Sequence, residues 1–344
     1  MIAFNTSFSI ILMYLLELFA SVLSWMKLGC IVQMMKIAVI GIVLMLGASL
    51  LVVADTQAAE GGYSNYIPGS YGDFAMAVEP EARLTLRNDV YAYSAEGNGS
   101  VRSGVIEAGA ELDVLANFTT LLYKPEVEFL GGSYALGVFV PIIYMDLDVS
   151  LTVGPLPLNQ QEDTLGLGDV ALIPIILFWN QGNIHTSFAQ FIVTPTADYD
   201  ANNFTNTGLN YWSYDTNFAL TYLDLETGQD LSFNIGHIYN TENDDTNYQT
   251  GRELHLDVAL NQFLSESFAV GVHGFYLKQI TGDRGSGAVL GDFKAKVAGI
   301  GPAILWSKQI GTRNVIFIAK WLHEFDEENR LEGDHFFASF AMDW

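Results

Sequence analysis

The final stretch of the chain, Asp334–Trp344, most constrains the fold, because its polarity alternates up to the last residue. One side of an extended strand would carry the apolar residues Phe336, Ala338, Phe340, Met342 and Trp344. The other side is mainly polar, with Phe337 as the exception. An apolar edge strand left uncovered in water invites aggregation. A closed barrel in lipid instead needs one apolar face, one polar face and an aromatic residue at the interface. The stretch therefore predicts the closing strand of an outer-membrane β-barrel.

The composition supports a barrel and excludes several functional classes. Only 16% of the 344 residues are charged and 50% are apolar, which leaves too few charges for an ordinary soluble surface. After Glu60 there is no run of about 18 apolar residues, so no transmembrane helix is predicted there. The net charge of −24 argues against nucleic acid as a partner.

The N-terminal region resembles an export signal rather than part of a fold. Met35-Lys36, the apolar run Ile37–Val53 and the small residues at 56–59 predict a signal peptide within residues 1–59. The earlier apolar stretch Phe8–Met26 is either part of an upstream mis-start covering residues 1–33 or a membrane anchor. The single cysteine, Cys30, precedes the cleavage point, so the mature chain is expected to contain no thiol.

Residues 81–344 divide into about twelve segments of alternating polarity. In the clearest one, Leu254, Leu256, Val258 and Leu260 alternate with polar residues. The predicted strands are 81–95, 104–124, 132–153, 166–180, 183–197, 211–225, 228–240, 251–263, 266–281, 291–307, 312–323 and 334–344. Connections after even-numbered strands are short and several after odd-numbered strands are long and acidic, as in outer-membrane barrels.

The segment 60–80 precedes the first strand and is rich in Gly, Ser and Tyr. Pro68 and Pro80 disfavour a long strand. The segment could hang in the periplasm, but its aromatic residues favour a plug within the barrel. The residues expected in the plug are Tyr66, Tyr71 and Phe74.

Four stretches carry a resemblance to a known family: EGGYSNYIPGSYGDF (60–74), GGSYALGVFVPIIY (131–144), LGLGDVALIPIILFW (165–179) and the terminal FFASFAMDW. They resemble the outer-membrane proteins known as meta-pathway of phenol degradation transporters. Gly168-Asp169-Val170 is the most recognisable local feature. The resemblance implies a barrel that passes small hydrophobic or aromatic molecules inward. It implies no particular functional residues.

No catalytic residues, metal site or cofactor are predicted, because no metal-ligand spacing and no nucleophile motif occur. Successive side chains of a strand point to opposite faces. This alternation predicts that His255, His273 and His335 lie inside the barrel and that His237 lies outside. A lipid-active barrel enzyme would need a serine beside His237 on the same face. Ser213 and Ser232 are expected to face inward, so a non-enzymatic role is favoured.

The lumen is expected to hold both charged and apolar side chains. The predicted lumen-lining or permeant-binding residues are Arg83, Arg87, Glu107, Glu111, Tyr144, Ile173, Trp179, Lys294, Lys296 and Lys320. The charges could form a rigid ladder of ion pairs or a selective constriction. Asp146 and Asp148 would set the inner face of the third strand, which places Tyr144 inside. The apolar residues could form a wall for an aromatic permeant or a surface on which the plug packs.

The sequence thus predicts an all-β protein, a transmembrane antiparallel barrel of about twelve strands in the bacterial outer membrane. Its expected function is passive uptake of small hydrophobic or aromatic compounds. The alternatives are a structural or adhesive barrel acting through acidic outer loops and, third, a lipid-active enzyme. Expected partners are outer-membrane lipid and lipopolysaccharide, the permeant, and the barrel assembly machinery through the C-terminal strand. The acidic clusters Asp244-Asp245 and Asp326-Glu327-Glu328 are interpreted as solvated loops, and binding of divalent cations that bridge lipopolysaccharide is the alternative.

Overall fold

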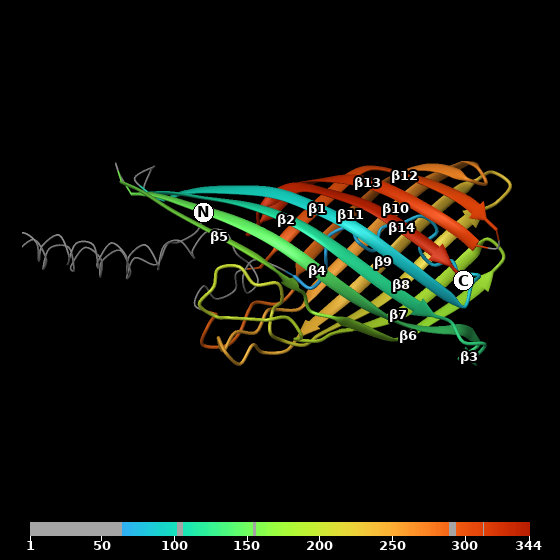
Figure 1. Cartoon of the computed structure of the whole chain (residues 1–344), viewed down its shortest axis with the longest axis horizontal. Coiled ribbons are helices and arrows are strands. Elements are labelled where there is room, and N and C mark those ends of the chain that lie inside the picture. The colour runs from blue at the N-terminus through green and yellow to red at the C-terminus, as the bar shows by residue number, and fades with distance from the viewer. Residues whose placement is uncertain (1–63, 102–105, 154–155, 289–293, 312) are drawn as a thin grey trace, which may run out of the picture. The chain divides into compact units, whose positions relative to one another are not determined.

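A computed structural model describes residues 64–101, 106–153, 156–288, 294–311 and 313–344, without the side chains of 98–108 and 151–158. The predicted signal peptide therefore lies outside the described residues. These residues form one antiparallel sheet whose first and last strands pair, which makes a closed barrel of 12 strands (Figure 1). The fold class is the one predicted. No helix in this part of the chain is long and apolar enough to cross a membrane.

The strands agree with the predicted segments to within a few residues at most ends. Their bounds are β1 Leu84–Val101, β2 Ile106–Tyr123, β3 Glu128–Phe129, β4 Gly132–Val153, β5 Leu156–Leu167, β6 Ala171–Gln181, β7 Ile184–Val193, β8 Ser213–Asp224, β9 Gln229–Asn240, β10 Glu253–Ser265, β11 Phe268–Gln279, β12 Lys296–Ile310, β13 Arg313–Glu328 and β14 Glu332–Asp343.

The C-terminal stretch closes the barrel as predicted. Strand β14 pairs with β1 from Asp343 opposite Thr85 to Glu332 opposite Glu96, and pairs with β13 on its other edge. The backbone N–H of Trp344 donates to the Leu84 carbonyl at 2.8 Å. Each strand of this ring of 12 is therefore paired with a neighbour on both sides, so the ring itself has no open edge.

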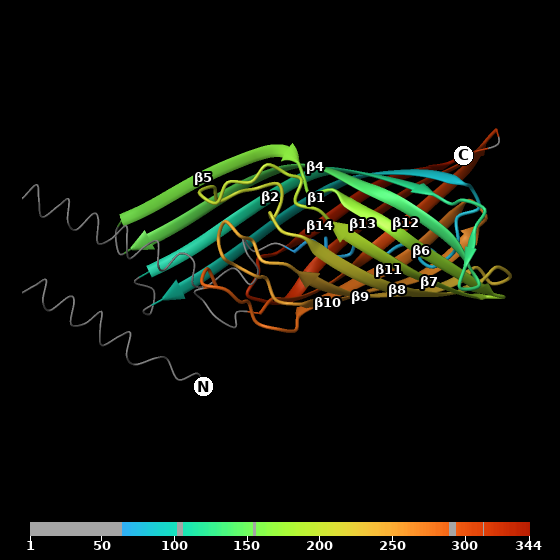
Figure 2. The same cartoon turned by 90° about the horizontal axis from the view of Figure 1, so that it is seen from below.

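The strands β3 and β5 lie outside this ring of 12. The two-residue β3 pairs only with β4, and β5 pairs only with the second half of β4. Strands β1, β2 and β4 have 18, 18 and 22 residues. A strand needs about 10 residues to cross the hydrocarbon core. These three strands and β5 therefore continue beyond the membrane, and Figures 1 and 2 show them extending past the other strands at one end.

The two ends of the barrel differ in loop length, as predicted. Glycines in the left-handed conformation make tight turns at one end: Gly182 (φ 63°), Gly228 (φ 71°) and Gly311 (φ 65°). Both barrel termini, Leu84 and Trp344, lie at this end. The other end carries the long connection 194–212 between β7 and β8 and the connection 241–252 between β9 and β10. Short turns and termini mark the periplasmic side.

Candidate functional site: the barrel interior

The segment from Ser64 to Pro80 lies against the inner face of the barrel. Its hydrogen bonds and ion pairs reach six strands. Ser64 and Gly72 bond to β10, Asn65, Tyr71 and Ala77 to β8, Ala75 to β9, Asp73 to β1, Gly69 to Lys320 of β13, and Glu79 to Asn180 of β6. Most of these partners are buried side chains such as Asp230 and Thr221. Because unpaired buried polar groups are costly, this side of the lumen fits the segment specifically.

Two tyrosines of the segment dock on His255 of β10. The Tyr66 and Tyr71 rings stack on the imidazole with centroids 4.0 Å and 5.2 Å away. Their hydroxyls donate to Asp257 at 2.9 Å and to Asp215 at 2.8 Å. His255 Nε2 lies 3.1 Å from Asp215 Oδ1. Burial raises the pKa of both tyrosine hydroxyls, and the neighbouring carboxylates raise it further, so both remain protonated donors.

Two cations hold the middle of the segment. Arg87 of β1 pairs with Asp73 of the segment, with Asp89 at 2.9 Å and with the Ser339 hydroxyl at 3.1 Å. The Lys320 ammonium donates to the carbonyls of Gly69 (2.7 Å) and Gly72. Burial raises the pKa of the Asp73 carboxyl, but Arg87 and Lys320 outweigh burial and hold that pKa below its usual range. Asp73 is therefore ionised and fixed.

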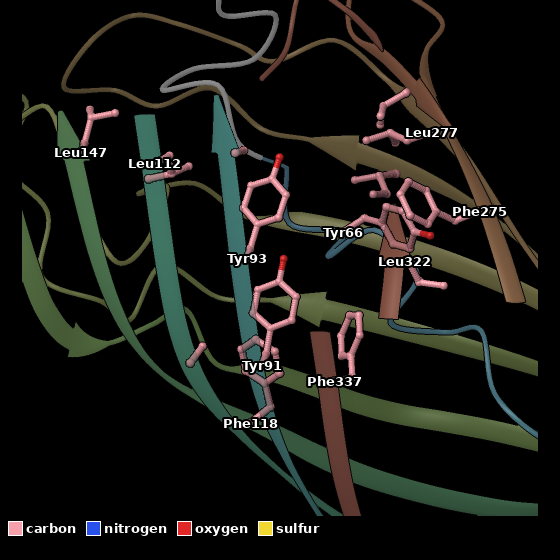
Figure 3. Close-up of a cluster of buried hydrophobic side chains, with 14 residues drawn as sticks. Tyr66, Tyr91, Tyr93, Leu112, Phe118, Leu147, Phe275, Leu277, Leu322 and Phe337 are labelled. Atoms are coloured by element: carbon pink, nitrogen blue, oxygen red, sulfur yellow. The ribbon is translucent and has the colours of Figure 1, made fainter. Parts of the chain in front are cut away.

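The remaining part of the lumen is hollow, and its wall is mainly apolar. A cavity of about 540 Å³ lies between the segment and strands β1, β2, β4, β6, β7 and β14. Its apolar lining includes Tyr91, Leu112, Val114, Ala116, Phe118, Phe139, Ile143, Met145, Ile173 and Phe337. Figure 3 shows Tyr91, Tyr93, Phe118 and Phe337 gathered on the inside of the sheet. A cavity of this size suits a small organic molecule.

Aromatic rings form much of this wall. The Tyr91 ring centroid lies 4.8 Å from that of Phe337 and 5.5 Å from that of Phe118, which in turn lies 5.3 Å from Phe139. The tyrosine hydroxyls are already engaged: Tyr91 contacts His335 Nδ1 at 2.9 Å, and Tyr93 donates to Glu324 at 2.8 Å. The wall therefore presents ring faces to the cavity.

Asp169 fixes the loop that borders the cavity on the outer side. One carboxylate oxygen accepts from the backbone N–H groups of Thr196 and Ala197, both at 3.0 Å, and the other accepts from Leu209 at 2.7 Å. Gly208 must lack a side chain, because a Cβ there would lie 2.5 Å from Asp169 Oδ1. Burial raises the pKa of the Asp169 carboxyl, and the three N–H donors oppose that rise. The distinctive Gly168-Asp169-Val170 feature is thus a loop anchor.

Several residues predicted to face the lumen do so. Arg87, Lys320 and Ile173 point inward. Arg87 and Lys320 bind the segment 64–80. The segment residues Tyr66, Tyr71 and Phe74 also lie inside. His255, His273 and His335 are buried inside as predicted.

Other predicted positions differ from the structure. On β2 and β4 the inner face carries Leu112, Phe139 and Met145, so Glu111 and Tyr144 lie on the outer face with Asp146 and Asp148. The reason is that these strands extend beyond the membrane, where carboxylates face water on the outside. On these two strands a charged side chain therefore does not identify the lumen face.

The parity of β6 changes within the strand. Its pairing with β7 is irregular between Leu172 and Ile175, next to Pro174, which has no N–H to donate. After this irregularity Ile176 and Phe178 face the interior. Trp179 therefore lies on the outer face, where its Nε1–H donates to the Leu130 carbonyl at 3.2 Å.

Two of the remaining predicted cations, Arg83 and Lys296, lie outside the lumen. Arg83 precedes β1, is exposed and pairs with Glu126. Lys296 is on the outer face of β12 and bonds to Asp326 at 2.9 Å. Lys294 precedes β12, and its carbonyl accepts from Asn329. The Glu107 side chain lies outside the described residues.

The prediction missed the aromatic wall of the cavity. Tyr91 and Tyr93 have the same parity as Arg87, which was already assigned to the lumen, so the signal was present in β1. Phe139 and Met145 were missed because the face of β4 was assigned from its aspartates.

The geometry around His237 offers no serine partner. His237 faces outward as predicted, and its cross-strand neighbours are Thr216 and Leu254. Ser213 and Ser232 are buried on the inner face. Among the described residues, no group of three or more His, Cys, Asp or Glu side chains could hold a metal ion.

Comparisons with known proteins agree with the fold. Residues 92–340 match the sequence model of the family that is described as the MetA-pathway of phenol degradation. An outer membrane channel from Pseudomonas putida F1 aligns with a TM-score of 0.53 at 13% identity, covering 80% of this chain and 99% of the other. The transport unit of the autotransporter AIDA-I from Escherichia coli (TM-score 0.41, 10% identity, 80% and 94% coverage) and a FadL homologue from Pseudomonas aeruginosa (0.38, 9%, 85% and 98%) are also similar. No curated protein matches.

Proposed function

Since the chain belongs to the MetA-pathway of phenol degradation family and folds as an outer-membrane barrel, we propose that it is a channel for passive uptake of small hydrophobic or aromatic compounds. The observation that carries this proposal is the 540 Å³ cavity with its apolar, aromatic-lined wall. Apolar pockets of this kind gain affinity from burying ring surface.

The division of the lumen supports the same proposal. The segment 64–80 occupies the polar side and leaves the apolar side unfilled. A water-filled porin has a polar lumen throughout. A lumen whose free volume is bounded mainly by apolar side chains favours solutes that lose little hydration free energy when they leave water. We propose that the segment acts as a plug that excludes larger polar solutes.

The test is uptake of labelled phenol into proteoliposomes containing lipopolysaccharide, with protein-free vesicles setting the background leak. The expected result is protein-dependent uptake of phenol and much slower uptake of a sugar of similar size. The Ala116→Phe variant fills the cavity from β2 and should remove most of this uptake. The matched control, Ala92→Phe, places the same ring on the lipid-facing side of β1. No protein-dependent phenol uptake would refute the proposal.

A second candidate is a structural or adhesive barrel acting through its exterior. The observation in its favour is a set of exposed carboxylates on the outer face of the extended strands, including Glu96, Glu111, Asp113 and Asp148. In that case lipopolysaccharide, bridged by divalent cations, would be the partner. The barrel assembly machinery would recognise the C-terminal strand in either case.

A further inference from the structure

The charges inside the barrel are strongly unbalanced. Four carboxylates line the cavity: Asp73, Asp89, Asp169 and Asp215. Four more are buried behind the segment or at the outer end: Asp230, Glu253, Asp257 and Glu324. The described interior contains three permanent cations, Arg87, Lys320 and Arg330. Even if His255, His273 and His335 were all protonated, carboxylates would remain in excess.

Both cavity arginines lie in the field of fixed carboxylates. Arg87 is already bound by Asp73, Asp89 and the Ser339 hydroxyl. Arg330 interacts electrostatically with Glu324 and Glu253. An anionic solute would therefore have to displace fixed carboxylates at Arg87, and near Arg330 it would meet the repulsion of Glu324 and Glu253.

The connections at the outer end of the barrel also carry negative charge. Asp198 and Asp200 are exposed in the connection 194–212, and Asp244 and Asp245 are exposed in the connection 241–252. Negative loops above a negative lumen lower the local concentration of anions and raise that of cations.

From this distribution we propose that the channel discriminates by charge, admitting neutral and cationic aromatic compounds such as arylalkyl ammonium ions and excluding aryl carboxylates and phenolates. The inference rests on the proposed uptake function and names its substrate class. Charge selects against the anion, while the aromatic wall accepts the ring of all three classes.

The experiment compares benzylammonium with benzoate, because the two ions share one ring and differ in sign. Uptake of each is measured at pH 7.4 in lipopolysaccharide-containing proteoliposomes, with phenol uptake measured in parallel. We expect benzylammonium to enter about tenfold faster than benzoate. Equal uptake of the two ions, including no uptake of either, or faster benzoate uptake would overturn the charge proposal. If the same proteoliposomes showed no protein-dependent uptake of phenol, the proposed function itself would be overturned.

A charge-matched pair of variants locates the effect. Asp215→Asn with Asp257→Asn removes two inner carboxylates while retaining hydrogen-bonding groups. Glu111→Gln with Asp113→Asn removes two carboxylates from the outer face. The inner pair should reduce the benzylammonium preference severalfold, and the outer pair should leave it unchanged; equal effects would contradict a luminal origin.

A second measurement does not depend on the folding of the variants. Raising the ionic strength from about 0.05 M to 1 M shortens the Debye length several-fold and screens the exposed loop carboxylates. The wild-type preference for benzylammonium should therefore shrink with salt. A preference independent of salt would exclude the contribution of the opening.

Discussion

Gly236 shows how one missing side chain makes room for the docking site of the segment. A Cβ at this position of β9 would lie 1.9 Å from His255 Nε2 and 2.8 Å from Asn217 Oδ1. The imidazole can therefore reach Asp215 and receive the rings of Tyr66 and Tyr71 only because residue 236 is glycine.

We predict that Gly236→Ala displaces His255 and loosens the segment. The unfolding free energy should fall by about 1–3 kcal/mol, as for other overpacked interiors. Urea-induced unfolding in lipid vesicles measures this change. The control is Ala298→Gly on the outer face of β12, a substitution that adds no atoms to the interior. Unchanged stability of Gly236→Ala would contradict the fit.

Asp73 gives a prediction about pH. Its folded pKa lies below its unfolded value, so its contribution to stability is fully present above the unfolded pKa and is lost as the pH falls through the folded pKa. The stability difference between wild type and Asp73→Asn should be constant from about pH 5 to 8 and should shrink progressively as the pH falls below the unfolded pKa of about 3.9. Unfolding titrations of both proteins across this range provide the measurement, and a difference that grows on acidification would reverse the assigned sign.

At the scale of elements, the outer connection 194–212 depends on Asp169 for its position. Asp169→Ala leaves three backbone N–H groups without their acceptor and should cost about 3 kcal/mol. The connection should become susceptible to proteolysis while the barrel remains resistant. Asp163→Ala, on the exposed outer side of β5, is the control, and protection of the connection in Asp169→Ala would show that other contacts suffice.

The segment 64–80 is the second element with a testable role. Deleting it removes Asp73 from Arg87, two backbone carbonyls from Lys320 and two stacked tyrosine rings from His255, and exposes the polar side of the lumen to water. We expect a larger single-channel conductance and faster sugar uptake, because a polar lumen can hydrate. Planar bilayer recordings compare the deletion with the intact chain. Equal conductance would show that the segment does not limit the path.

At the scale of the whole molecule, loop length and pairing fix the orientation. Ser286 lies in the connection between β11 and β12, and Thr227 lies in the turn between β8 and β9, at opposite ends. Because Cys30 is the only cysteine and precedes the expected cleavage point, single cysteines serve as clean probes. In intact cells, an impermeant thiol reagent should label Ser286→Cys and spare Thr227→Cys. Labelling of both after lysis is the control, and the reverse pattern would invert the topology.

The sequence by itself determined the barrel, its strands and the alternation of its loops. Period-2 polarity, tight turns and an aromatic C-terminus are local consequences of strands that face lipid on one side, so residues such as Phe336 and Trp344 carry the signal directly. Arg87 and Lys320 could be assigned inward for the same reason, since a charge facing hydrocarbon is costly.

Only the tertiary structure decided which face of β2 and β4 lines the lumen. Those strands continue beyond the hydrocarbon, where Glu111 and Asp148 meet water on the outside, so polarity no longer separates inside from outside. Near Pro174 the side chains of β6 exchange their inward and outward faces. This exchange depends on the pairing of β6 with β4 and β7, and the alternation of polarity in the sequence does not show it. The division of the lumen into a polar docking side and an apolar cavity likewise arises from contacts between residues far apart in the chain, such as Tyr71 with Asp215 and Tyr91 with Phe337.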